Sequence, residues 1–226
     1  NLTESDISVD SPTNNFATLN PNDAHTTSPT FAEGNLDYTA VSGTTHNSAR
    51  STIAVSTGKW YMEYTLKVTG GGVGIITTQS PINDNLRDSS DVRSIYRGHT
   101  GYYYGRNNAG AVDDQGDNSE TLTAGDVIGI ALDLDNGYAY FAKNNVWMKG
   151  QDGSTAGIPT SGSNGTGAAN PTSQKLTDQH NGEWTFMAYD LNTSSSGRMI
   201  ANFGQDSSFA GNKTAQGNQD GNDIGD

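Results

Sequence analysis

Apolar and polar residues alternate along residues 59–68 (KWYMEYTLKV). Successive side chains of a β-strand point to opposite faces of the sheet, so a period of two predicts a half-buried strand. The face expected toward the core carries Trp60, Met62, Tyr64, Leu66 and Val68. The face expected toward solvent carries Lys59, Tyr61, Glu63, Thr65 and Lys67.

Further strands are expected where short apolar runs are bounded by turn residues. These runs are residues 52–55, 73–76, 102–104, 126–134, 138–143, 146–148, 183–189 and 198–203. The dipeptide Asn136-Gly137 between two of them predicts a β-hairpin with a type I′ turn, in which both central residues have positive φ. Asn144-Asn145 is a candidate for a second tight turn. No helical period is visible, so the pattern predicts an all-β sandwich or barrel.

Composition divides the chain into three parts. Residues 1–48 are polar and contain three of the six prolines, which predicts an extended segment that docks on the sandwich or on a neighbouring subunit. Residues 49–206 carry the strand signals and are the expected sandwich, with residues 150–182 as a long surface loop. Residues 207–226 are rich in Gly, Asn and Asp and are expected to form a C-terminal loop.

Charge and cysteine content narrow the classes of function. The 226 residues include no cysteine, which excludes disulfides, thiol catalysis and Cys-ligated zinc. The formal net charge of −13 disfavours binding to nucleic acid or to anionic membranes. No apolar run approaches the ~18–20 residues that a membrane helix needs, so membrane insertion is not expected.

Four motifs resemble the SPRY domain and stand in the order in which that family carries them. They are residues 58–63 (GKWYME), 72–75 (GVGI), 125–145 (GDVIGIALDLDNGYAYFAKNN) and 202–205 (NFGQ). The resemblance implies a two-layer antiparallel β-sandwich of the SPRY, concanavalin A-like jelly-roll type. It also implies a non-catalytic module that binds partners through loops at one end of the sandwich. The side chains expected to fill the layer between the sheets are Trp60, Leu132, Phe141, Trp184 and Phe203.

A narrower resemblance lies near the N-terminus. Residues 10–21 (DSPTNNFATLNP) are similar to the lead-in of SPRY-containing proteins of marine bacteriophages and prophages. This resemblance implies a virion component, such as a tail fibre, appendage or capsid-surface protein, with a virion or extracellular location. The partners would be other virion subunits and a host-surface glycan or protein, within a homo-oligomer or a larger assembly.

The main candidate for a binding site is a basic and aromatic cluster. Four of the twelve Lys and Arg residues lie between positions 87 and 106 of this acidic chain. Arg and Tyr are enriched at interaction hot spots. In the alternative interpretation, the tyrosines cover the core and the arginines pair with acids such as Asp88 and Asp91. The predicted binding residues are Arg93, Tyr96, Arg97, His99, Tyr102, Tyr103 and Arg106.

One acidic loop is a candidate Ca²⁺ site. It places four carboxylates within eight residues beside a glycine, and calcium favours such oxygen-rich loops. Its spacing does not match the EF-hand pattern, and the alternative is a solvated acidic loop. The four residues are Asp113, Asp114, Asp117 and Glu120.

Catalytic patterns are weak. A glycan hydrolase needs two carboxyl groups about 5–10 Å apart across a cleft. Asp133 and Asp135 alternate on one strand, but they lead directly into the turn at Asn136 and are expected to serve that turn. The four histidines share no metal-binding spacing, and no nucleophile-elbow motif occurs. We therefore expect no enzyme; a carbohydrate-binding, lectin-like domain stays open as an alternative, and a sandwich-fold glycan hydrolase as a less favoured one.

Overall fold

The computed structural model describes most of the expected sandwich. The described residues are 15–27, 29–43, 46–83, 86, 94–98, 100, 103–106, 112–115, 120–148, 157–161, 182–190, 196–206, 208–209, 211, 213–214 and 217. They form fourteen strands and one short 3-10 turn, Pro159–Ser161, with no α-helix among them. No helix in this part of the chain has the length and apolar character needed to cross a membrane.

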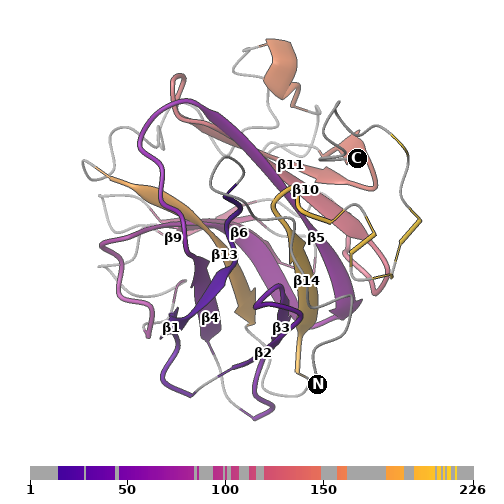
Figure 1. Cartoon of the computed structure of the whole chain (residues 1–226). Helices are drawn as coiled ribbons and strands as arrows, with labels where there is room; N and C mark the ends of the chain where they lie inside the picture. The colour runs from indigo at the N-terminus through magenta and orange to yellow at the C-terminus, as the bar shows by residue number, and fades with distance from the viewer. Residues whose placement is uncertain are drawn as a thin grey trace.

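The strands form two sheets, and every pairing between the described strands is antiparallel (Figure 1). The first sheet has, in spatial order, β1 (Leu19–Ala24), β4 (Asn47–Ser51), β13 (Trp184–Asp190), β6 (Gly71–Thr77), β7 (Ser94–Gly98), β8 (Tyr103–Arg106) and β9 (Val112–Gln115). The second has β12 (Val146–Trp147), β11 (Tyr138–Lys143), β10 (Val127–Asp133), β5 (Lys59–Val68), β14 (Arg198–Asn202), β3 (Asp37–Thr39) and β2 (Thr30–Ala32).

The main core lies between the two sheets and is built from alternate residues of the central strands. In β5 these are Met62, Tyr64 and Leu66, each at most 1% exposed. The neighbouring and facing strands supply Ile128, Ile130, Leu132, Phe141, Val73, Ile75, Trp184, Phe186 and Ala188. Alternation in the sequence therefore identified the buried faces, and the predicted two-layer antiparallel β-sandwich is confirmed.

Trp60 departs from the expected core. Its side chain is 45% exposed, and its Nε1 donates a hydrogen bond to the carbonyl of Thr57 at 2.8 Å. Val68, at the other end of the same strand, is 40% exposed. β5 has ten residues and the facing β6 has seven, so both ends of β5 extend past the packed layer. An alternating pattern identifies the face of a strand but not where the facing sheet ends.

The type I′ turn lies at the second predicted turn and not at the first. The hairpin between β10 and β11 is present, but its loop has four residues because Asp133 pairs with Tyr138. Only Gly137 has positive φ there (80°), so the predicted type I′ turn at Asn136-Gly137 is wrong. Asn144 and Asn145 instead have φ of 48° and 64°, which fits a two-residue type I′ turn between β11 and β12.

The N-terminal strands contribute to both sheets. β1 and β4 belong to the first sheet, and β2 and β3 belong to the second, where β3 pairs with β14 (Figure 1). The boundary expected between residues 48 and 49 falls inside β4. Residues 1–14, and most of the segments 150–182 and 207–226, lie outside the described residues.

Candidate interaction surface

The described members of the predicted basic and aromatic set lie along two strands near one edge of the first sheet. Tyr96 and Arg97 are in β7, and Tyr103 and Arg106 are in β8, beside the edge strand β9. The register places Arg97 opposite Tyr103. Arg93, His99 and Tyr102 lie outside the described residues. The binding role of this set stays a prediction.

Three of the four candidate calcium ligands lie among the described residues. Asp113 and Asp114 are in β9, where they pair with Gly105 and Tyr104. Asp117 lies outside the described residues, and Glu120 lies between β9 and β10. Within the described part of the chain, no three His, Asp or Glu side chains gather as a metal site would require.

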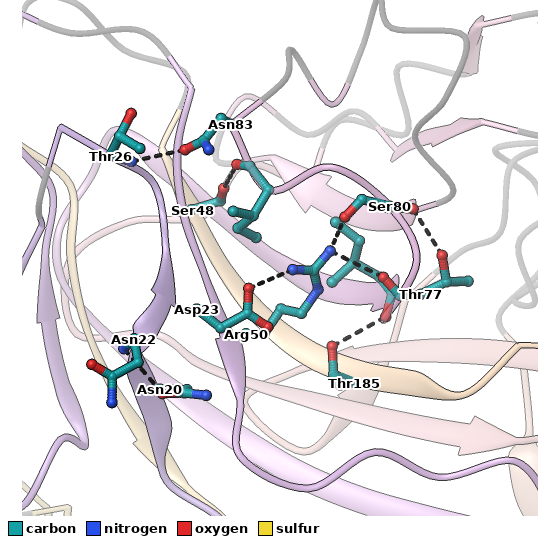
Figure 2. Close-up of polar contacts among 12 residues, drawn as sticks. Asn20, Asn22, Asp23, Thr26, Ser48, Arg50, Thr77, Ser80, Asn83 and Thr185 are labelled. Atoms are coloured by element: carbon teal, nitrogen blue, oxygen red, sulfur yellow. Dashed lines mark hydrogen bonds and ion pairs between the residues drawn. The ribbon is translucent and has the colours of Figure 1, made fainter.

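A buried arginine anchors the segment that leaves β6 toward β7. Arg50 of β4 is 3% exposed and pairs in register with Met187 on β13. Its Nη1 donates to Asp23 Oδ1 at 2.7 Å, and its Nη2 donates to the carbonyl of Thr77 at 3.2 Å and to that of Ser80 (Figure 2). Burial lowers the pKa of Arg50 and Asp23 opposes this shift, but a guanidinium stays charged at physiological pH.

Other contacts fix the same segment on the outer face of the first sheet. Ser48 Oγ donates to the carbonyl of Ile82 at 2.8 Å, and Asn83 Oδ1 accepts from the backbone N–H of Thr26 at 2.8 Å (Figure 2). Beneath them lies a small apolar cluster, which contains Ile76, Leu86, Met187 and Tyr189, with Ile82 packed against it. Residues 78–83 are thus held both by polar contacts and by packing.

Three segments meet at this end of the sandwich, which we call the loop end and define as residues 52–58, 78–83 and 134–137. Val55 exchanges two 2.8 Å backbone hydrogen bonds with Trp184, whose register partner is Thr77 at the end of β6. Gly58 donates to Asp135 Oδ1 at 2.8 Å. Segment 52–58 therefore links the other two, and the exposed Trp60 lies two residues beyond it.

Two aspartates brace the ends of β10. Asp133 accepts from the N–H and Nδ2 of Asn136 at 3.0 and 2.8 Å and lies 3.2 Å from Lys59 Nζ. Asp126 accepts from Thr123 and Asn144 and pairs with Lys143 Nζ at 3.0 Å. Burial alone would raise the pKa of each carboxyl, but the donated hydrogen bonds outweigh it and lower both pKa values. These contacts agree with the turn role predicted for Asp133.

The outer face of the second sheet carries aromatic residues that sequence reasoning did not bring together. We call Tyr61, Tyr138, Tyr140 and Trp147 the aromatic surface. Trp147 contacts Tyr61 and Tyr140 edge to face, with both centroid distances 6.5 Å, and Tyr138 contacts Tyr140 at 6.3 Å. Tyr138 and Tyr140 are buried, whereas Tyr61 is 51% exposed. The alternation of Tyr138 and Tyr140 in the sequence places both on one face of a strand. That Tyr61 shares this face becomes clear only from the register of β5, β10 and β11.

Tyr61 is fixed by a small neighbour and by a carboxylate. Its ring and hydroxyl occupy the space that a Cβ would need at Gly129 on the adjacent strand. Its hydroxyl donates to Glu63 Oε1 at 2.6 Å. Burial, followed by this hydrogen bond, raises the pKa of Tyr61 well above its ordinary value. The phenol is therefore a neutral donor at any physiological pH.

The family assignment agrees with this geometry. Residues 59–157, which include the strands from β5 to β12, match the family model described as SPRY domain. This stretch of the chain is similar to a SPRY domain. The four sequence motifs that resemble this family fall in β5, in β6, in the β10–β11 hairpin and at the end of β14. SPRY domains are in general protein–protein interaction modules without catalytic activity.

A solved SPRY domain shows a similar fold. The SPRY domain of human HERC1 superposes with a TM-score of 0.55 at 17% identity, covering 82% of this chain and 97% of that chain. The TRIM65 PSpry domain gives a TM-score of 0.49 at 13% identity, covering 82% and 91%. At 17% identity, the likeness to the HERC1 domain shows the fold alone. The search of curated proteins found no match.

Proposed function

We propose that this SPRY domain is a non-catalytic module that binds a protein partner within a bacteriophage virion, as part of a tail fibre, appendage or capsid-surface protein. The resemblance of residues 10–21 to the lead-in of phage SPRY proteins supports the virion role. The net charge of −13 supports a protein partner rather than nucleic acid. Such a module would act at the virion surface, outside the host cell or in contact with it.

The loop end is the observation that carries this proposal. Arg50 is buried and holds residues 77–80 through backbone carbonyls, so this part of the surface is ordered before any partner arrives. A preordered loop loses less conformational entropy on binding. Trp60 offers a half-exposed indole beside these segments, and tryptophan is enriched among the residues that dominate binding energy.

The test is partner binding by paired variants at the two ends of β5. Subunits released from disrupted phage particles are passed over the immobilised chain, and the retained subunit is identified and its affinity measured. Trp60→Ala is expected to weaken binding by roughly 30-fold, as for a hot-spot residue. Val68→Ala, a similarly exposed position at the opposite end, is the control and is expected to bind as the unmodified chain does. Retention of no virion subunit, or equal affinities for both variants, contradicts the proposal.

A lectin-like role is the second candidate, and the half-exposed Tyr61 ring beside Glu63 is the observation that favours it. An aromatic face can stack on a sugar, while a carboxylate accepts hydrogen bonds from its hydroxyls. A glycan-array signal that is lost in Tyr61→Ala would favour this function. Asp133 is committed to Asn136 and Lys59, so a hydrolase would require measured polysaccharide turnover that Asp133→Asn abolishes.

A further inference from the structure

We infer that the aromatic surface is a second binding site, distinct from the loop end, and that it accepts the guanidinium of an arginine side chain from a protein partner. The site lies on the outer face of β5, β10, β11 and β12, whereas the loop end is formed by the segments around Trp60 and Arg50. This inference rests on the proposed function in one respect only, which is that the ligand belongs to a protein.

Strand register leaves room for the Tyr61 ring at this site. Glu63, Gly129, Ala142 and Trp147 are successive partners across four strands, so two small residues lie between the carboxylate and the indole. Tyr61 leans over Gly129 into this space and meets Trp147 at an interplanar angle of 73°. The two rings therefore form two walls of a corner rather than one flat platform.

The Tyr61 ring is accessible at this corner. It is 51% exposed, and Trp147 is partly exposed beside it. Tyr140 is fully buried beneath Trp147 and supports it from below. A ligand group can thus reach the exposed part of the Tyr61 ring, while Tyr140 packs beneath Trp147.

Charge selects a cation for this corner. The face of an aromatic ring attracts cations, and arginine is the most frequent protein partner. Glu63 accepts one hydrogen bond from Tyr61 and keeps further acceptor sites for guanidinium donors. Lys59 lies on the same face of β5, two positions before Tyr61. Its ammonium is 3.2 Å from Asp133, so this ion pair adds no net charge to the site. The net charge of −13 further attracts a basic partner.

A sugar ring fits this geometry less well. A flat pyranose face needs one open aromatic plane, and here Trp147 stands nearly perpendicular to Tyr61 at a centroid distance of 6.5 Å. A planar guanidinium can lie on Tyr61 and direct its N–H groups to the Glu63 carboxylate. Arginine is therefore preferred over a glycan, and glycan binding is an outcome of the test.

The test compares two peptides that differ only in charge. Ac-Gly-Arg-Gly-NH2 and its citrulline analogue, which has a neutral urea in place of the guanidinium, are titrated into the full chain while indole and backbone NMR signals are followed. The arginine peptide is expected to bind about fivefold more tightly, as a cation–π contact at an exposed site implies. This preference is expected to disappear in Tyr61→Leu and to decrease in Glu63→Gln and at high salt.

Trp60→Leu is the matched control, because Trp60 and Tyr61 are adjacent exposed aromatic residues on opposite faces of β5. It is expected to keep the arginine preference while it weakens partner binding at the loop end. Equal affinities for the two peptides, an arginine preference that survives Tyr61→Leu, or glycan binding at Tyr61 would overturn the inference. If the arginine preference is absent but partner binding is intact, the inference fails and the proposed function stands. If the arginine preference is present but no virion partner is retained, the inference stands and the proposed function fails.

Discussion

At the scale of single residues, Arg50 shows how one side chain fixes a loop. Arg50→Ala is expected to lower the free energy of unfolding by roughly 2–4 kcal/mol, because the carbonyls of Thr77 and Ser80 lose a buried donor. Asp23→Ala is expected to cost less than Arg50→Ala, because the guanidinium keeps its hydrogen bonds to the two carbonyls and the Asp23 side chain is 42% exposed. Urea denaturation measures both values. Equal costs would mean that the ion pair, and not the carbonyl contacts, holds the segment.

Gly129 makes a second prediction at this scale. A methyl group at this position would overlap the Tyr61 hydroxyl, which is the far end of a half-exposed side chain. Gly129→Ala is therefore expected to displace Tyr61 from Glu63 and Trp147, while the free energy of unfolding changes by less than about 1 kcal/mol. NMR contacts between Tyr61 and Trp147 report the displacement. Unchanged contacts in the variant would show that Tyr61 does not depend on this close approach.

At the scale of elements, the β10–β11 hairpin should respond to acid. The pKa values of Asp126 and Asp133 are lowered from the ordinary value of 3.8, because the donated hydrogen bonds outweigh burial. The stability that these groups contribute is complete above the ordinary pKa and is lost as pH falls through the lower, folded-state values. The free energy of unfolding is expected to decrease below about pH 4 and to decrease less in the Asp126→Asn, Asp133→Asn double variant. Parallel acid profiles for the two proteins would contradict this account.

The same hairpin shows how far local sequence specifies an element. Alternating apolar residues predicted β5 with the correct buried face, and a continuous apolar run predicted β10. The turn type was wrong because the Asp133 carboxylate binds the N–H and the side chain of Asn136, which favours a four-residue loop with positive φ at Gly137 alone. A dipeptide rule contains no such competing side-chain contact.

At the scale of the whole molecule, the sequence predicted the sandwich but not which strands pair or which distant side chains meet. The split of β1 and β4 from β2 and β3 into different sheets depends on pairings with β13 and β14, which are far along the chain. The contacts of Arg50 with Ser80, and of Tyr61 with Trp147, likewise arise only when distant strands come into register. Local patterns encode which face of a strand is buried, whereas these sites depend on long-range register.

The central claim is that the loop end contacts another virion protein. Lys59 starts β5 at this end, and its side chain is 58% exposed, so it is a suitable site for an amine-reactive cross-linker. Cross-linking mass spectrometry on the intact native particle is the most direct measurement. The account predicts cross-links from Lys59 to a second virion subunit, which Trp60→Ala particles lose or show at a much lower level. Lys59 cross-links that stay within its own chain, in particles that carry the domain, would contradict it.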